Sequence, residues 1–126
     1  MATTPQFATT PHIGLAQIST ANTNRDGTGA VVDVITGATN GTRIDRVTVM
    51  ATGTTTQGMV RLYLSDGTNT RLWKEVLVSA VTPSGTVAAF TSPLSSLGVD
   101  LPPSYKIRAS TNNGETFNIL AEGGDF

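Results

Sequence analysis

Short alternating runs of apolar and polar residues recur along this chain, and no window shows the spacing of an amphipathic helix. In an alternating run every second side chain points to the same side, as in a strand with one buried face. These runs predict about eight short strands separated by turn-forming residues. We place the strands at residues 12–18, 30–36, 43–51, 59–65, 71–80, 86–90, 105–110 and 116–121.

Two turn signals indicate how neighbouring strands pair. Residues 66–69, with the sequence Asp-Gly-Thr-Asn, join the fourth and fifth expected strands, and Asp-Gly is a strong hairpin dipeptide. Residues 112–115, with the sequence Asn-Asn-Gly-Glu, join the last two, and Asn-Gly favours a type I′ turn. We therefore expect an antiparallel hairpin at each place, after which residues 122–126 leave the sheet.

Alternation also predicts which side chains form the core. In the fourth strand Val60 and Leu62 are expected to face inward and Arg61 outward. Residues 92–103 contain three prolines and are expected to be irregular. Their apolar side chains are expected to close one end of the core: Leu94, Leu97, Val99 and Leu101.

The first eleven residues show no alternation, and two prolines favour extended backbone there. We expect an extended N-terminal arm over residues 1–11, followed by a single domain over residues 12–126. The domain is expected to be all-β, an antiparallel β-sandwich of jelly-roll type. Two interpretations of the arm are open: a frayed terminus, or a segment that lies on a neighbouring subunit. In the second case the candidate interface residues are Pro5, Phe7, Pro11 and His12.

The composition is unusually poor in charge. Only 13% of the 126 residues are charged, the net charge is −1, and threonine is the most common residue. The cationic residues are scattered rather than clustered, which argues against nucleic acid as a partner. No apolar run is long enough to span a bilayer, and residues 1–10 lack the basic and apolar regions of a secretory signal.

The chain is also poor in catalytic residue types. It has no cysteine and a single histidine, His12, and most of its acidic residues fall in expected turns. A nucleophile with its base, or a converging pair of carboxylates, is not apparent. We therefore expect no enzyme activity, no catalytic residue, no cofactor and no metal site.

One loop carries a weak calcium signal. The spacing Asn22-x-Asn24-x-Asp26-Gly27 matches the opening of an EF-hand-type loop, and Asp33 stands where the closing acid would be. Against calcium, Arg25 adds positive charge and the flanks are expected strands. The alternative is a loop whose side chains bond to their own backbone, and the sequence leaves the choice open.

Trp73 is the largest aromatic side chain, and it lies in the middle of an expected strand. Packing in the core or at a subunit interface is one interpretation, and a platform for a sugar ring is the other.

A small sandwich has edge strands, which monomers usually guard with charge. This chain has little charge for that purpose, which favours edges covered by further copies of itself.

Several stretches resemble small structural proteins of tailed bacteriophages. They are PHIGLAQISTANTNRDGTG at 11–29, LPPSY at 101–105, AST at 109–111, ETFN at 115–118 and GGDF at 123–126. The resemblance implies a capsid decoration (cement) protein that binds the outer surface of the phage head and stabilises it. Its partners would be the major capsid protein and itself, with a trimer favoured over a dimer.

The implied location is the surface of the virion, after synthesis in the host cytoplasm. Two alternatives stay open: a neck, tail or fibre component, and a carbohydrate-binding module for host attachment.

Overall fold

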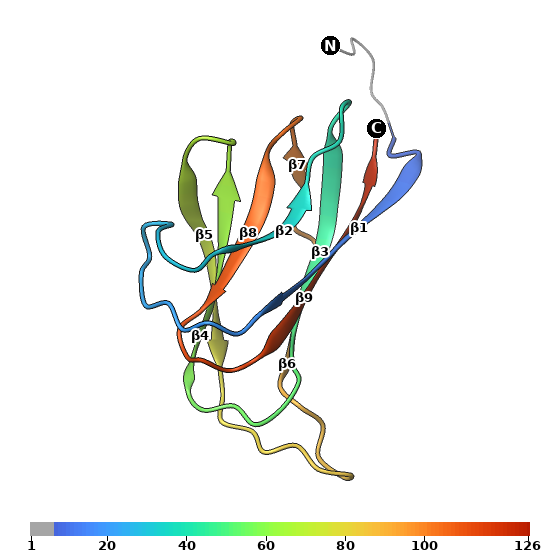
Figure 1. Ribbon diagram of the computed structural model, residues 1–126. Helices are drawn as coiled ribbons and strands as arrows, with labels where there is room; N and C mark the ends of the chain where they lie inside the picture. Colours follow the sequence, from blue (N-terminus) through green and yellow to red (C-terminus); the bar gives the residue numbers. More distant parts are fainter. Residues whose placement is uncertain (1–6) are drawn as a thin grey trace.

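The computed structural model describes residues 7–126, which form nine β-strands in two antiparallel sheets and no helix (Figure 1). The strands are β1 (Thr10–Ile18), β2 (Val32–Thr36), β3 (Thr42–Ala51), β4 (Gly58–Ser65), β5 (Thr70–Val78), β6 (Thr91–Leu94), β7 (Val99–Leu101), β8 (Lys106–Thr111) and β9 (Phe117–Asp125).

The strand pairing is that of one long hairpin wrapped into two layers. Outward from the turn at 66–69, β4 pairs with β5, β3 with β6 and β7, β2 with β8, and β1 with β9. Sheet A has the order β1-β9-β3-β6, with β7 also beside β3, and sheet B has the order β2-β8-β4-β5. Because β6 and β7 share one strand position, the fold is an eight-position jelly roll. The expected all-β sandwich is confirmed.

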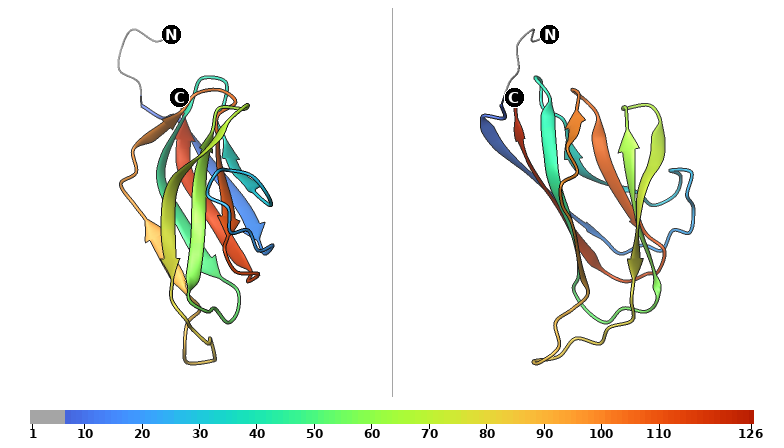
Figure 2. Two further views of the ribbon diagram at one scale, coloured as in Figure 1. Left: turned by 90° about the vertical axis from the view of Figure 1, so that its left-hand side faces the viewer. Right: turned by 180° about the vertical axis from the view of Figure 1, so that it is seen from behind.

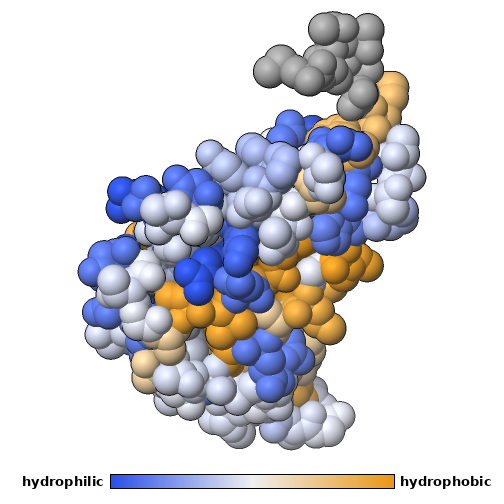
Figure 3. All heavy atoms as spheres, turned by 45° about the horizontal axis from the view of Figure 1, so that its top comes forward, coloured by the Kyte–Doolittle hydropathy of each residue, from blue (hydrophilic) through white to orange (hydrophobic). Residues whose placement is uncertain are grey.

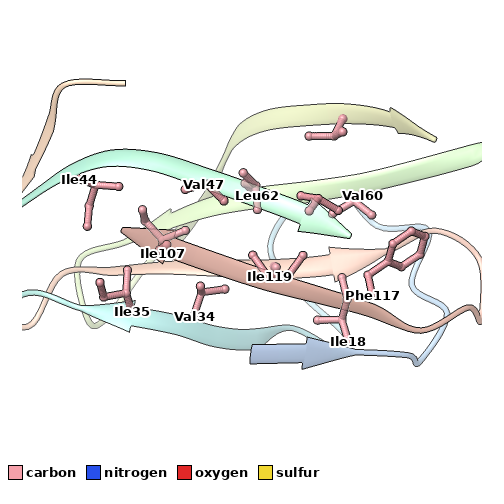
Figure 4. Packing of buried hydrophobic residues seen from close by; sticks show 14 of the residues in the cluster. Ile18, Val34, Ile35, Ile44, Val47, Val60, Leu62, Ile107, Phe117 and Ile119 are labelled. Carbon is pink, nitrogen blue, oxygen red and sulfur yellow. The ribbon is translucent and has the colours of Figure 1, made fainter. Parts of the chain in front are cut away.

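The core lies between the sheets, where side chains of both layers point toward one another (Figure 4). Val60 and Leu62 are fully buried, as expected. The expected closure of the core by residues 92–103 is confirmed, since Leu101 is buried and Leu94, Leu97 and Val99 pack against the cluster. The buried apolar residues are Ile18, Val34, Ile35, Ile44, Val47, Val49, Ala51, Val60, Leu62, Val76, Val78, Leu101, Ile107, Ala109, Phe117, Ile119 and Ala121.

The hairpin expected across residues 112–115 is wrong. β8 lies in sheet B and β9 in sheet A, so this connection crosses between the layers. A type I′ turn needs positive φ at both central residues, and neither Asn113 nor Gly114 has it. Ile107 and Ile119 therefore belong to opposite sheets, and both side chains are part of the core (Figure 4). The last residues do not leave the sheet either, because β9 continues to Asp125 between β1 and β3.

The segment between β5 and β6 also differs from the expectation. Residues 79–90 cross from sheet B to sheet A and extend beyond the ends of both sheets (Figure 2). No strand forms at 86–90, because Val87 bonds to Ser84 in a tight turn (Ser84 N to Val87 O, 2.9 Å). Strands β6 and β7 form instead within the region expected to be irregular, which raises the count to nine.

The first strand begins earlier than expected. Thr10 and Pro11, assigned to the arm from the sequence, belong to β1, and Pro11 lies opposite Gly124. The Thr9 amide also donates to the Asp125 carbonyl (2.8 Å). Pro5 lies outside the described residues.

Candidate interaction surface

The outer face of sheet B is covered by the chain itself. The loop at residues 19–31, between β1 and β2, lies over β4, where the Tyr63 hydroxyl donates to the Asn24 carbonyl (2.9 Å). Arg61 points to this outer side, as expected, but it is not solvent-exposed as an outward arginine would be. Its Nη1 donates to the Asn22 carbonyl (3.1 Å), and its side chain is only 3% exposed.

A carboxylate compensates the buried guanidinium. Oε2 of Glu75 on β5 accepts from Nε of Arg61 (3.1 Å) and from Nε of Arg25 in the covering loop (2.8 Å). The hydrogen bond from Arg25, and then that from Arg61, hold the pKa of Glu75 below its usual value. Glu75 therefore joins the loop to the sheet, and this face of the molecule is already occupied.

The calcium-like loop uses its oxygens internally. The buried Asn22 amide donates to the carbonyls of Thr28 and Ala30, and Oδ1 of Asp26 accepts from both the amide and the hydroxyl of Thr28. Hydrogen bonds from Thr28 lower the pKa of Asp26. These contacts are those of the self-bonded loop.

Asp33, the expected closing acid, is paired elsewhere. Its carboxylate lies 3.0 Å from Nζ of Lys106 and 2.7 Å from Nε of Arg108, both on β8. Lys106 first, and then Arg108, lower the pKa of Asp33. Residues 7–126 contain no group of three or more acidic or histidine side chains placed to hold a metal ion.

The outer face of sheet A, in contrast, is bare. Ile13 is 63% exposed, Leu15 is 72% exposed and Met50 is 45% exposed. Leu15 lies opposite Leu120 of β9, and Leu120 lies opposite Thr48 of β3. We call this set the sheet A face: Ile13, Leu15, Thr48, Met50 and Leu120. Figure 3 shows apolar residues, in orange, lying among polar residues, in blue and white, on the side turned to the viewer.

Close packing explains why β1 turns its large apolar side chains outward. Gly14 and Ala16 face inward, and a Cβ at Gly14 would collide with the Val34 carbonyl and the Ile35 side chain on β2. The sandwich is too narrow here for isoleucine or leucine, so Ile13 and Leu15 face solvent. Sequence reasoning missed these two residues, although the small residues between them were a signal of close approach.

The four edge strands are unequally guarded. β5 carries Arg71, Lys74 and Glu75, β6 is four residues long with Pro93 at its third position, and Asp33 of β2 is held in ion pairs. β1 is nine residues long and has no acidic residue, lysine or arginine. Charge, proline and short length are the usual protections of an edge, and β1 has only Pro11, at its second position.

The only histidine ties the start of β1 to the end of β9. Nδ1 of His12 lies 2.7 Å from Oδ1 of Asp125, and the Thr42 hydroxyl of β3 donates to the same oxygen (2.7 Å). The hydrogen bond from Thr42, and then that from His12, lower the pKa of Asp125. Thr42 is fully buried, so its hydroxyl cannot reach a substrate. The cluster is a structural tie.

The expected interface residues are placed at one end of sheet A. Phe7 is 89% exposed and lies three residues before β1. Pro11 and His12 are the second and third residues of β1, and they lie opposite Gly124 and Gly123 of β9. His12 is half-buried by its contacts with Asp125 and Thr42. Phe7 is the most exposed large apolar side chain of the described residues.

Trp73 is part of the fold. In the ladder between β4 and β5, Leu62 pairs with Lys74 and Tyr63 with Leu72, so Trp73 is an extra residue in a β-bulge. Its side chain packs against the core, and Nζ of Lys74 lies 5.2 Å from the ring centroid. A sugar platform needs a free ring face, and this packing leaves less of the ring available.

Within residues 7–126 no helix is long and apolar enough to cross a membrane.

Comparison with solved structures shows a similar fold in a virus particle. The structure described as "Cyanophage Pam1 capsid asymmetric unit" contains a chain that matches with a TM-score of 0.52 and 12% identity, over 100% of this chain and 92% of that chain. "Structure of infectious bursal disease virus Gx strain" matches with a TM-score of 0.39 and 13% identity, over 98% of this chain but 35% of that chain.

No protein-family model matches the sequence, and no curated protein matches it. At 12% identity the first match shows a shared fold. Because it takes in nearly the whole of both chains, the two chains are also of similar size.

Proposed function

We propose that this protein is a capsid decoration protein, which binds the outside of a bacteriophage head and holds neighbouring shell subunits together. The observation that carries the proposal is the whole-length match to a jelly roll that belongs to a phage capsid. Fold alone does not assign function, so the surface of this chain has to supply the remaining support.

The surface supports a role in assembly. The sheet A face is apolar. Arg46 lies opposite Glu122 beside it, and Arg43, Asp45 and Asp100 form exposed ion pairs on β3 and β7 of the same sheet, whereas the sheet B face is covered by its own loop. Uncharged surface is cheaper to bury against a partner than ionic surface. We propose that the sheet A face lies against the shell and that the loop-covered face points away from it.

The same surface argues against catalysis. In residues 7–126 the imidazole of His12 is bonded to Asp125, and the neighbouring hydroxyl of Thr42 is buried. A nucleophile and its base must both be accessible to a substrate. The proposed role is therefore structural, and it places the protein on the virion surface as a homo-oligomer, with three copies favoured by the resemblance to phage proteins.

The test is binding to heads purified without this protein. Wild-type protein should co-sediment with the heads at hundreds of copies per particle, and electron microscopy should locate it on the outer surface. Met50→Lys, which places a charge on the sheet A face, should lower occupancy at least about tenfold, equivalent to about 1.4 kcal/mol of binding free energy. Leu77→Lys is the matched control, because Leu77 is 71% exposed on β5 of the other sheet and should retain wild-type occupancy.

Two results would contradict the proposal. Failure of the wild-type protein to bind heads would exclude decoration. Binding of only a few copies at the neck, tail or fibres would assign the chain to those parts of the virion instead.

A further inference from the structure

We infer that a hollow at one end of the sandwich binds a neutral pyranose sugar, which packs on Tyr105 and forms hydrogen bonds with Arg71 and Asp66. The hollow lies between the β4–β5 hairpin of sheet B and the connection from β7 to β8, at the end of the molecule where the C-terminus lies (Figure 1). Its volume is about 570 Å³, within the range of about 300–1,000 Å³ typical of small-molecule sites. The inference goes beyond the proposed function and does not rest on it. We call this site the Tyr105 hollow.

The floor of the Tyr105 hollow is apolar. Leu101 of β7 is buried, and Leu64 of β4 and Val99 of β7 pack against the core cluster. Tyr105, which is 39% exposed, adds an aromatic ring to the wall. One face of a pyranose ring presents only C–H groups, so its contact with this surface removes apolar area of both partners from water.

The backbone that carries Tyr105 is fixed by the fold. The Tyr105 amide donates to the Pro102 carbonyl (3.1 Å), and its carbonyl accepts from the Gly37 amide (2.8 Å). The turn at 102–105 is closely packed, because a Cβ at Gly37 would collide with the Pro102 carbonyl. A wall that is already formed lowers the entropic cost of ordering the site around a ligand.

Arg71 supplies hydrogen-bond donors to the hollow. It lies directly opposite Leu64 in the ladder between β4 and β5. Residues in such a pair point to the same face of the sheet, so the Arg71 side chain leaves β5 on the side of the hollow that it lines. Arg71 forms an ion pair with none of the acidic side chains in residues 7–126. Its planar guanidinium can therefore donate to two neighbouring hydroxyls of a ligand.

Two acidic residues border the hollow, and their contacts differ. Asp100 lies opposite Arg43, and its carboxylate is 4.0 Å from Nη1 of Arg43 on the outer side of sheet A. Oδ1 of Asp66 accepts from the amides of Thr68 (2.9 Å) and Asn69 (2.7 Å), which fixes this carboxylate at the tip of the β4–β5 hairpin. A carboxylate has two oxygens and several acceptor positions, so Asp66 can also accept from a hydroxyl of the ligand.

This combination favours a neutral sugar over an ion. Arg71 and Asp66 carry opposite charges at the same hollow, so their fields oppose one another and neither an anion nor a cation is selected. A hydroxyl both donates and accepts, and it therefore suits a guanidinium and a carboxylate equally. A pyranose has several hydroxyls around its edge as well as an apolar face. The sugar interpretation of the sequence thus applies to Tyr105 rather than to Trp73, which packs against the core.

The first experiment is a titration of the isotope-labelled full chain, followed by two-dimensional NMR. The probes are D-glucose, D-galactose, D-mannose and N-acetyl-D-glucosamine, each added up to tens of millimolar. Millimolar affinity is expected, because an open site covers only part of a small ligand. At least one sugar should shift the backbone amides of residues 64–71 and 99–105 in a saturable way. Sorbitol, which has the hydroxyls but no ring, should not do so.

The second experiment repeats the titration on variants with the sugar that binds best. Arg71→Ala should weaken binding at least about tenfold, and so should Tyr105→Ala. Tyr105→Phe keeps the ring and should bind within about threefold of the wild type. Arg46→Ala is the matched control, because Arg46 is also an exposed arginine but lies on β3 of the other sheet. Thermal melts verify that each variant is folded, and Arg71, being exposed, can be changed even if Tyr105→Ala does not fold.

Four outcomes would overturn the inference. They are the absence of a saturable shift with all four sugars, equal shifts with sorbitol, Arg71→Ala binding as tightly as the wild type, or tighter binding of sodium phenylacetate than of every sugar. The last would show that Arg71 selects an organic anion. None of these measurements uses phage heads, so their failure is separate from a failure of head binding.

Discussion

Nε of Arg61 on β4 lies 3.1 Å from Oε2 of Glu75 on β5, and the loop that joins β1 to β2 covers this pair. An arginine with a 3% exposed side chain would be costly to bury without such partners. Nη2 of Arg61 also donates to Oδ1 of Asn112 (3.2 Å), so one guanidinium bonds to a strand, a loop and a connection between sheets.

Arg61→Ala is expected to lower the free energy of unfolding by about 2–4 kcal/mol, because buried acceptors lose their donors and a cavity remains. Urea denaturation measures this change. The covering loop should also open, so that trypsin cleaves after Arg25 faster than in the wild type. Arg46→Ala, at an exposed position of β3, should change stability by no more than about 0.5 kcal/mol. Equal stability of the two variants would contradict the role given to Arg61.

Asp125 should make stability depend on acid pH. Its pKa is lowered in the folded chain, so the ionised form is favoured by folding. The stabilisation is therefore present above the unfolded value of about 3.9 and is lost as the pH falls through the lower folded value.

Asp125→Asn should consequently be less stable than the wild type at pH 7, and the difference should shrink below about pH 4. Unfolding by urea at pH 7, 4 and 2 tests this expectation. Thr42→Val removes the hydrogen bond that contributes most to the lowered pKa of Asp125, so this variant should also lose less stability than the wild type on acidification. A difference that persists unchanged at pH 2 would show that Asp125 acts through packing alone.

Gly14→Ala should destabilise the fold by about 1–3 kcal/mol, because the added Cβ meets backbone of β2 that cannot move away freely. Gly85→Ala is the control, since a Cβ at Gly85 has no atom within 4 Å and its change should stay within about 0.5 kcal/mol. Thermal melts of the two variants decide the matter, and a Gly14→Ala protein as stable as its control would mean that β1 and β2 are not in close contact.

Removal of calcium should not affect the fold. Asp26 is bonded to Thr28 and Asp33 to Lys106, so neither carboxylate is free to bind a cation without breaking these contacts. Melting temperatures in the presence of a chelator and of millimolar calcium should agree within the error of the measurement. A clear rise with calcium would instead show that the loop rearranges around the ion.

The alternation of apolar and polar side chains predicted most strands because one face of each strand is buried. This two-residue period is visible in the residues of the strand itself, without knowledge of its partners. The hairpin at 66–69 was predictable for a similar reason: the Asp66 carboxylate caps its own turn by accepting from the amides of Thr68 and Asn69, and Gly67 takes the positive φ of 95°. The dipeptide at 113–114 was misleading, because a turn signal does not specify whether the next strand pairs or crosses to the other sheet.

The surface was harder to predict than the core. Ile13 and Leu15 alternate with Gly14 and Ala16, and this pattern fits a strand of either orientation. Only the approach of Val34, twenty residues further along the chain than Gly14, determines which pair faces the solvent. The covering of Arg61 likewise depends on a loop distant in sequence, so alternation alone showed only the side of the sheet to which it points.

The crossing between β5 and β6 gives the molecule a natural place for an insertion. This crossing projects past the ends of both layers (Figure 2), and its tight turn between Ser84 and Val87, which contains Gly85, brings the two flanking backbones together. A foreign peptide spliced in at that turn would begin and end at nearly the same point, so the layers beneath it need not separate. Under the proposed function, each copy bound to a phage head would then display the peptide.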